Sequence, residues 1–227
     1  MPPRGTILFD VNETILDLSS LRPRFRAGFG DEAITETWFS MLLHSSTVCV
    51  LTEIKTDFAS LAGTMLDTIA GRKGVALPGS LRDEILDGFS SLLPYTDVKP
   101  ALIRLRNAGY QTVAFTNSSL DLVTRQIENA GLAEYYDNLV SVEPTGSFKP
   151  DARVYRFVAE FLERPIGELR LVSTHDWDAH GAIAAGMQAA YIDRSGAPYH
   201  PLYRQPDVCG ATLEDIVDQT IAIDDRK

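Results

Sequence analysis

The chain has 227 residues and a formal net charge of −10 at pH 7, and 44% of its residues are hydrophobic. This length gives room for one large domain, or for a core that carries a smaller inserted unit. The acidic balance argues against a nucleic-acid partner, because phosphate backbones are bound by clusters of lysine and arginine. No apolar run approaches the roughly 20 residues that a membrane helix needs, so we expect no membrane partner.

The N-terminal segment has no pattern typical of an export signal. Its apolar run at 6–9 is shorter than the core of a signal peptide. The two cysteines, Cys49 and Cys209, lie far apart and show no metal-ligand spacing. Reduced thiols of this kind fit an intracellular protein, and we therefore expect a cytoplasmic location.

The first predicted element is a short buried strand at 6–9, which ends at Asp10. A long region follows in which apolar residues keep helical spacing and no strand is evident. This region predicts helices over 19–30, 31–46, 53–73 and 79–92.

From Asp97 onward, predicted helices and strands alternate. Glycines at 109, 131 and 186 mark the ends of three of the helices. The stretch 194–210, which contains proline and glycine, is expected to be a surface loop. The expected order is helix 97–108, strand 111–116, helix 119–130, strand 138–142, helix 151–163, strand 169–174, helix 178–186, strand 189–193 and helix 212–222.

Strands that alternate with helices of this length indicate a doubly wound, Rossmann-like α/β fold with a parallel sheet. The helical region interrupts this pattern directly after the first strand. The simplest architecture is therefore an α/β catalytic core over 1–14 and 96–227 with a helical cap inserted over 15–95. In such sheets, ligands bind outside the carboxyl ends of the strands.

Polar side chains stand where four of the predicted strands end. One polar strand end is common, whereas four together indicate a site at the carboxyl edge of the sheet. The four groups are Asp10, then Thr116-Asn117-Ser118, then Lys149 before the next helix, and finally Ser173-Thr174-His175-Asp176-Trp177-Asp178.

These groups resemble the haloacid dehalogenase superfamily of hydrolases. The resemblance covers essentially the whole predicted core, with the motifs in the family's order and the helical insertion in the family's place. Two further features resemble the type II 2-haloacid dehalogenases, namely Tyr155 six residues after Lys149 and the run that begins at Trp177. The motifs are Phe9-Asp10-Val11-Asn12-Glu13-Thr14, Thr116-Asn117, Lys149-Pro150, and Trp177-Asp178-Ala179-x-Gly181-Ala182 followed by Ala185-Gly186.

The resemblance implies four catalytic roles. Asp10 is the expected nucleophile, which attacks carbon or phosphorus of the substrate and forms an ester. Thr14 is expected to hold the nucleophile loop. Lys149 is expected to keep Asp10 ionised. Asp178 is expected to orient or activate the water that hydrolyses the ester.

Further residues are expected to bind the substrate or to support the catalytic residues. The residues expected to bind the substrate or the halide are Asn12, Thr116, Asn117, Phe39, Phe58 and His175. Thr116 is expected to hydrogen-bond the charged substrate group or the nucleophile. Asn117 precedes a helix N-terminus, which favours an anion, and the matching asparagine of dehalogenases helps to hold the leaving halide. Tyr155 and Ser173 are expected to support Lys149 and the water.

Two positions depart from the phosphatase pattern of the superfamily. Phosphatases carry an acid for the leaving alcohol two residues after the nucleophile, where this chain has Asn12. Departure of a halide needs no protonation, so Asn12 is compatible with dehalogenation, although dehalogenases usually have tyrosine there. Phosphatases also place an acidic metal ligand four residues before the last Asp, where this chain has Thr174. With one carboxylate fewer, Mg²⁺ binding should be weak, and we expect no metal site and no required cofactor.

The predicted cap departs from the dehalogenase pattern as well. Many members have an arginine after a tryptophan in the first cap helices, which binds halide or carboxylate, but here Trp38 is followed by Phe39. Phe58 fits an aromatic position of that pocket. His175, where typical members have asparagine, is a candidate hydrogen-bond donor to the leaving anion. The substrate can therefore differ from the simple 2-chloropropionate type.

Each candidate also has a purely structural interpretation. Asp178 begins a predicted helix, where Asp is a favoured N-cap residue, and Asn117 could equally act as a cap only. A core-facing tyrosine such as Tyr155 is common in helices. The cap aromatics fit packing between helices, and His175 fits a structural hydrogen bond.

The sequence therefore predicts a hydrolase that acts through an aspartyl ester and converts a small 2-haloacid to a 2-hydroxy acid. The alternatives are a Mg²⁺-dependent small-molecule phosphatase of the same superfamily, and a degenerate member that binds a ligand without turnover. Halide release that persists in EDTA separates the first from the second. The expected partner is a small anionic substrate, and a homodimer is compatible with the resemblance because capped members often pair through the cap.

Overall fold

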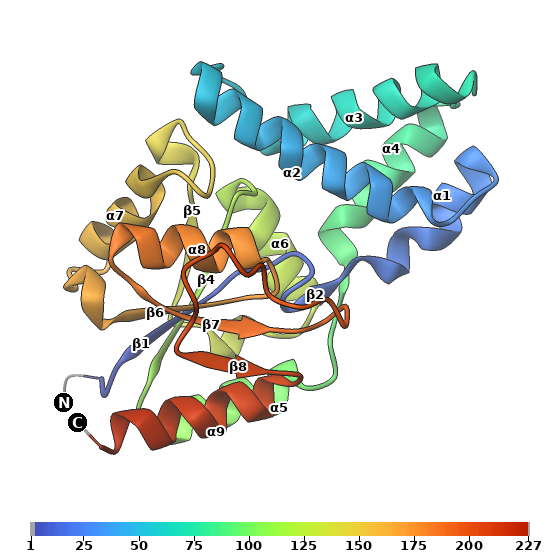
Figure 1. Ribbon diagram of the computed structural model, residues 1–227. Coiled ribbons are helices and arrows are strands. Elements are labelled where there is room, and N and C mark those ends of the chain that lie inside the picture. Colours follow the sequence, from blue (N-terminus) through green and yellow to red (C-terminus); the bar gives the residue numbers. More distant parts are fainter. Residues whose placement is uncertain (1–2, 227) are drawn as a thin grey trace.

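A computed structural model describes residues 3–226 and shows a six-stranded sheet with helices on both faces (Figure 1). The strand order is β5-β4-β1-β6-β7-β8, and all five pairings are parallel. The doubly wound α/β fold predicted from the sequence is therefore confirmed. The strands are β1 (Thr6–Phe9), β4 (Gln111–Thr116), β5 (Asn138–Ser141), β6 (Leu169–Ser173), β7 (Gln188–Ile192) and β8 (Val208–Gly210).

Strand β1 lies in the middle of the sheet and is buried along its whole length. A continuous apolar run suits this place, because a central parallel strand is covered on both faces. The chain passes from β1 to β4 and β5 on one side and then to β6, β7 and β8 on the other. Asp10 therefore leaves the sheet beside the point where the strand order reverses, which is where ligands bind in folds of this kind.

Helices cover the two faces of the sheet in separate groups (Figure 1). Helices α7 and α8 pack together on one face, α5 and α9 pack together on the other, and α6 lies against β5. The bounds are α5 (Val98–Asn107), α6 (Leu120–Asn129), α7 (Ala152–Phe161), α8 (Asp176–Ala185) and α9 (Leu213–Asp224).

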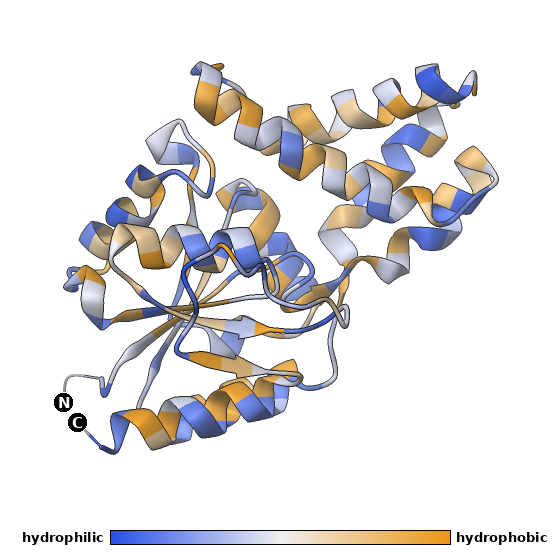
Figure 2. Ribbon diagram, in the orientation of Figure 1, coloured by the Kyte–Doolittle hydropathy of each residue, from blue (hydrophilic) through white to orange (hydrophobic). Residues whose placement is uncertain are grey.

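Helix α9 shows how the pattern of apolar residues places these helices. Its buried residues, Leu213, Ile216, Val217 and Thr220, have the spacing of one helix face. Figure 2 shows the resulting alternation of hydrophobic and hydrophilic segments along the helix. A capping box between Thr212 and the third helical residue begins the helix by satisfying backbone N–H groups that have no partner within it.

Four helices form a separate layer above the sheet, which we call the helical layer (Figure 1). Two short antiparallel strands, β2 (Leu16–Asp17) and β3 (Leu93–Pro94), join it to the rest of the chain. Residues 1, 2 and 227, which belong to the expected core, lie outside the described residues. The layer consists of α1 (Arg22–Phe29), α2 (Ile34–Thr52), α3 (Phe58–Lys73) and α4 (Gly79–Gly88).

Trp38 of α2 is the centre of packing in the helical layer. Its ring is fully buried and lies 5.3 Å from the ring of Phe25 and 5.7 Å from that of Phe89. The indole Nε1 donates to the carbonyl of Ala62 on α3 at 2.9 Å, which satisfies the one polar atom that this burial removes from water.

Between residues 3 and 226, no helix is long and apolar enough to cross a membrane.

Several elements differ from the prediction, and helix α2 runs to Thr52 rather than ending at 46. The expected loop 194–210 ends in strand β8, which pairs with β7 at the edge of the sheet. Its three residues are too few to show a period of two along the sequence. The pairing of β2 with β3 was not expected, because each strand has two residues. Helix α8 begins at Asp176 rather than at 178, and His175 takes the N-cap position.

Candidate active site

Lys149 joins the two predicted catalytic aspartates in the interior of the protein. Its Nζ lies 3.1 Å from Asp10 Oδ1, 2.9 Å from Asp178 Oδ2 and 2.8 Å from the carbonyl oxygen of Phe115. Asp10 follows β1, Lys149 precedes α7 and Asp178 lies in α8, so the site is assembled from distant parts of the chain. An ammonium group has three N–H donors, and each of them here has an acceptor.

Burial and charge act against one another in this group. Burial lowers the pKa of Lys149, but the two carboxylates outweigh this effect, and the net shift is upward. Burial raises the pKa of Asp178, and the ammonium of Lys149 offsets only a part of that rise. Lys149 therefore stays charged, whereas Asp178 accepts a proton more readily than an ordinary aspartate does.

Thr14 links the loop that follows Asp10 to the end of β6. Its hydroxyl donates to Asp10 Oδ2 at 2.8 Å and accepts from the backbone N–H of Thr174 at 3.0 Å. One oxygen of Asp10 is thus bound by Lys149 and the other by Thr14. These contacts hold the carboxylate in one orientation.

Tyr155 supports Asp178 from the side opposite to Lys149. Its hydroxyl donates to Asp178 Oδ1 at 2.6 Å, and the whole side chain is buried. Gly181, one turn after Asp178 on α8, leaves room for the tyrosine, because a Cβ there would lie 2.7 Å from the hydroxyl oxygen. Burial is the larger cause and the negative charge of Asp178 the next in raising the pKa of Tyr155 well above its ordinary value. The phenol therefore keeps its proton and stays a hydrogen-bond donor.

The side chain of Asn12 is held on the side of α6. Its Nδ2 donates to Ser118 Oγ at 3.3 Å, and its Oδ1 accepts from Gln126 Nε2 at 3.1 Å. Both ends of this amide therefore have protein partners. These contacts hold the side chain of Asn12 in place in the loop that follows Asp10.

The residues after β4 make contacts within their own turn and with the Lys149 segment. Thr116 Oγ accepts from the backbone N–H of Ser118 at 3.1 Å. Asn117 Oδ1 accepts from the backbone N–H of Lys149 at 2.9 Å, which leaves the amide nitrogen as the end that a ligand could meet. Asn117 thus contacts the Lys149 segment, and it is not the cap of α6, because the N-cap is Ser119.

His175 lies next to the predicted nucleophile, Asp10. Its Nε2 is 3.3 Å from the carbonyl oxygen of Asn12 and 3.7 Å from Asp10 Oδ2. Ser173 Oγ accepts from the backbone N–H of His175 at 3.0 Å, so the contact of Ser173 is with the histidine. The N-cap interpretation of Asp178 is wrong, because His175 is the N-cap and the backbone N–H of Asp178 already lies within the first turn.

The helical layer contributes Phe39 and Phe58 to the region above the sheet. The ring of Phe39, on α2, lies 6.2 Å from the ring of His175. Phe58, on α3, lies 6.1 Å from Phe148, which precedes Lys149 in the core. Both phenylalanines are buried. They therefore line the contact between the helical layer and the core, close to His175 and to the segment that carries Lys149.

Sequence reasoning missed several groups of this site. Glu13 lies 3.7 Å from His175 Nε2, and the carbonyl of Phe115 binds Lys149. Arg194 binds the carbonyl of Thr14 through Nε and Nη2, at 3.2 and 3.0 Å, and also pairs with Asp97. No local pattern marks these residues, because each acts through a contact between segments that are far apart in the sequence or through a backbone atom.

The donor set around Asp178 does not fit a magnesium ion. Thr174 stands at the position of the missing carboxylate, and the two oxygens of Asp178 are bound by Lys149 and Tyr155. Within residues 3–226, no three side chains of His, Cys, Asp or Glu are grouped as metal ligands.

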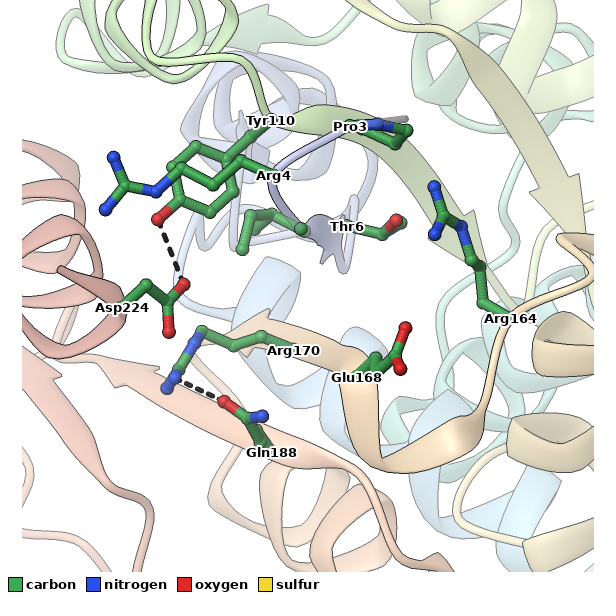
Figure 3. Close-up of a pocket in the computed structure, with 11 residues that line it drawn as sticks. Pro3, Arg4, Thr6, Tyr110, Arg164, Glu168, Arg170, Gln188 and Asp224 are labelled. Carbon is green, nitrogen blue, oxygen red and sulfur yellow. Dashed lines mark hydrogen bonds between the residues drawn. The ribbon is translucent and has the colours of Figure 1, made fainter. Parts of the chain in front are cut away.

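A separate pocket of about 230 Å³ lies at the opposite edge of the sheet, where the strands begin (Figure 3). Figure 3 shows the hydroxyl of Tyr110 directed at Asp224, at 2.9 Å, and the guanidinium of Arg170 directed at Gln188, at 2.5 Å. Arg170 also pairs with Asp207 at 2.6 Å. These polar groups bind one another, and none of the predicted catalytic residues lines this pocket.

The fold and the site define a class of protein: a doubly wound α/β protein with a buried Asp–Lys–Asp group at the carboxyl edge of its sheet. The chain belongs to the haloacid dehalogenase-like hydrolase family, whose model matches residues 5–186. The resemblance inferred from the strand ends is therefore confirmed.

Several characterised proteins are similar to this chain over nearly its whole length. The (S)-2-haloacid dehalogenase of Pseudomonas sp. (strain YL) is 26% identical over 93% of this chain and 92% of its own. The (S)-2-haloacid dehalogenase 1 of Pseudomonas sp. (strain CBS-3) is 28% identical, and the match covers 87% of this chain and 88% of its own. The structure of L-2-haloacid dehalogenase from Xanthobacter autotrophicus superposes with a TM-score of 0.87, at 25% identity, and covers 97% of this chain and 98% of the other.

Proposed function

We propose that this protein is a hydrolytic dehalogenase of small 2-haloacids that works through an ester on Asp10. The observation that carries the proposal is the buried contact of Lys149 with both Asp10 and Asp178. The names of the relatives support the choice of substrate class, and the (S)-2-haloacids are the first compounds to test.

The first step needs an oriented carboxylate. Lys149 and Thr14 supply the orientation, because each binds one oxygen of Asp10. A carboxylate oxygen of Asp10 attacks C2 of the substrate, the new C–O bond forms, and the halide leaves with the electron pair of the C–X bond. No proton is needed for this departure. The absence of an acid at Asn12 therefore does not impair the step.

The second step hydrolyses the ester. Asp178 takes a proton from a water molecule as the water oxygen attacks Cγ of Asp10. The bond between Cγ and the Asp10 oxygen that is now attached to C2 then breaks. That oxygen takes up a proton and leaves as the hydroxyl of the 2-hydroxy acid, and the oxygen of the water replaces it in the Asp10 carboxylate. The net products are the hydroxy acid, one halide ion and one proton.

The helical layer closes the substrate site in this proposal and acts as the cap. Phe39 and Phe58 supply apolar walls, because both are buried where the layer meets the core. The Asn117 amide nitrogen is the proposed donor to the leaving halide. His175, between Phe39 and Asp10, faces the substrate from the other side. Closure of this kind excludes water from the first step.

The proposed reaction needs no metal and no cofactor. The donor set at Thr174 and Asp178 supports this part of the proposal. The expected cytoplasmic location stays a prediction. The resemblance is compatible with a homodimer, and light scattering of the purified chain measures the oligomeric state.

The decisive experiment is a substrate panel measured for halide and for phosphate release, with and without EDTA. We expect halide release from a 2-haloacid that persists in EDTA and is lost in Asp10→Asn. A single turnover in heavy-oxygen water should label the peptide that contains Asp10, because water attacks its carboxyl carbon. Phosphate release that EDTA abolishes would support the phosphatase instead. Ligand binding without turnover on the whole panel would support the degenerate member.

A further inference from the structure

Glu13 has a backbone conformation that side-chain-bearing residues seldom adopt. Its φ is +64°, in the left-handed region that favours glycine. The backbone N–H of Glu13 donates to the carbonyl of Leu16 at 2.8 Å, which holds this turn directly after the nucleophile. The position therefore carries a glutamate although glycine would be the easier residue there.

The side chain of Glu13 reaches the imidazole beside the nucleophile. His175 Nε2 lies 3.7 Å from Glu13 Oε2 and 3.7 Å from Asp10 Oδ2. The same nitrogen is 3.3 Å from the carbonyl oxygen of Asn12, which can only accept. Nε2 therefore carries a hydrogen, and an added proton would go to Nδ1.

The catalytic centre has too few cations for an anionic ligand. Asp10, Glu13 and Asp178 are three carboxylates, and they face the single ammonium of Lys149 when the imidazole is neutral. All three donors of Lys149 already have acceptors within the protein. A small anion that binds over Asp10 would add a further negative charge to this group.

The arginines near the imidazole are occupied by other partners. Arg22 pairs with Glu36, and Arg194 pairs with Asp97. Of the groups that the structure places around Asp10, His175 is thus the one that can gain a positive charge. The charged groups around the imidazole are Asp10 and Glu13 from the nucleophile loop, Asp17, Arg22 and Glu36 from the segments that face it, Arg194 from the loop after β7, and Asp176 and Asp178 from its own helix.

We propose that Glu13 and His175 couple the binding of a small anion at Asp10 to the uptake of one proton. The proton comes from solvent and adds to Nδ1 of His175, and the carboxylate of Glu13 stabilises the imidazolium that forms. Glu13 is a positioning residue in this scheme, because it acts through the histidine. Many members of the family have an arginine where this chain has Phe39. The Glu13–His175 pair supplies a positive charge in place of that arginine. The identity of the anion rests on the proposed function, whereas the coupling does not.

The structure offers a route for this proton. A pocket of about 310 Å³ is lined by Glu13, His175 and Arg194 and by Arg22 and Glu36 of the helical layer. It brings solvent to the Glu13–His175 pair without passing Asp10, which does not line it. Burial raises the pKa of Glu13, and the nearby histidine opposes that rise.

Calorimetry tests the coupling without any turnover. Propionate and chloride are titrated separately into the wild-type protein, in two buffers of equal near-neutral pH and different ionisation enthalpy. The observed binding enthalpy is compared with the ionisation enthalpy of each buffer. The slope of this relation gives the number of protons taken up per anion bound. Uptake with propionate assigns the pair to the substrate carboxylate, and uptake with chloride assigns it to the leaving halide; either result supports the proposal.

Variants identify the residues responsible. Glu13→Gln and His175→Asn should abolish the uptake and weaken anion binding about tenfold, since one nearby charge is lost. Glu36→Gln, in the same pocket but paired with Arg22, should keep the uptake. No uptake in the wild type, or full uptake in both Glu13→Gln and His175→Asn, would overturn the proposal. If the wild-type protein takes up a proton on anion binding but releases no halide from any 2-haloacid, the proposed function is wrong and the proposed coupling is still supported.

Discussion

Nζ of Lys149 lies 2.9 Å from Oδ2 of Asp178, and solvent reaches almost none of either side chain. A buried ammonium between two carboxylates is stable only while all three groups remain together, because each is costly to bury alone. The centre that performs the proposed chemistry is therefore also part of what holds the sheet to α7 and α8.

Replacing Lys149 with methionine should destabilise the fold strongly. The change leaves Asp10 and Asp178 buried without their cation, so we expect a loss of about 3–5 kcal/mol in the free energy of unfolding near neutral pH. When burial raises the pKa of a carboxylate in the folded state, the free energy of unfolding falls as the pH rises through that pKa. The loss in Lys149→Met should therefore be larger at about pH 8 than at about pH 5.

Urea unfolding at the two pH values measures this effect. Lys99→Met is the control, because Lys99 is exposed and its change should stay within about 0.5 kcal/mol. A loss in Lys149→Met that is equal at both pH values would contradict the charge argument.

Replacing Tyr155 with phenylalanine should shift the pH dependence of turnover. The hydrogen bond from Tyr155 lowers the pKa of Asp178, so its removal raises that pKa further. Asp178 must be ionised to accept a proton from water, and the acid limb of kcat should move up by about one pH unit. The free energy of unfolding should fall by about 1–2 kcal/mol.

Tyr136→Phe is the matched control for this variant. The hydroxyl of Tyr136 is buried and has no hydrogen-bond partner among the residues described, so its removal should leave stability unchanged or raise it. An unchanged acid limb in Tyr155→Phe would show that Asp178 does not set it.

Replacing Gly181 with alanine should damage the site through Tyr155. The new Cβ would lie 2.7 Å from the Tyr155 hydroxyl and 2.7 Å from Cβ of Pro150, so the tyrosine must move away from Asp178. We expect kcat to fall at least about tenfold and the free energy of unfolding to fall by about 1–3 kcal/mol. In Gly71→Ala, where a Cβ meets no atom within 4 Å, the better helix propensity of alanine should raise stability by about 0.5–1 kcal/mol. Equal behaviour of the two variants would refute the steric argument.

Replacing Glu13 with glutamine should make the fold less sensitive to alkaline pH. Burial raises the pKa of Glu13, so its contribution to stability is complete below the ordinary pKa of a glutamate and is lost as pH rises through the folded-state value. The variant removes that loss, and its stability relative to the wild type should increase from about pH 5 to about pH 8.

Glu163→Gln is the matched control, because Glu163 also has a positive φ, of +52°, but is exposed. Its stability relative to the wild type should not depend on pH over the same range. Thermal unfolding of the three proteins at the two pH values makes the comparison, and a relative stability of Glu13→Gln that falls as pH rises would contradict the prediction.

Much of the fold and the central site could be predicted from local patterns alone. Short apolar runs such as 6–9 can be accommodated only where both faces of a strand are covered, and their regular alternation with helices permits few topologies. In a parallel sheet, the carboxyl ends of the strands lie at one edge, so Asp10 and the residues after β4 and β6 had to come close. The meeting of Asp10 with Lys149 and Asp178 follows from that rule.

The rest depends on contacts that leave no local pattern. The three residues of β8 are too short for a period, and their pairing with β7 decides their structure. The use of the Phe115 carbonyl by Lys149 involves a backbone atom, which any residue would provide. The approach of Glu13 to His175 joins segments about 160 residues apart and depends on one left-handed turn.

The sequence by itself thus determined the class of fold and the meeting of Asp10 with Lys149 and Asp178, because the order of residues shows which charged side chains follow the strands; the roles predicted for these residues came from the family resemblance. Only the tertiary structure decided which atoms bind Lys149, where α8 begins, and that Glu13 faces His175. Side-chain direction and the pairing of distant segments are set by packing across the whole chain, and this information is absent from any local window.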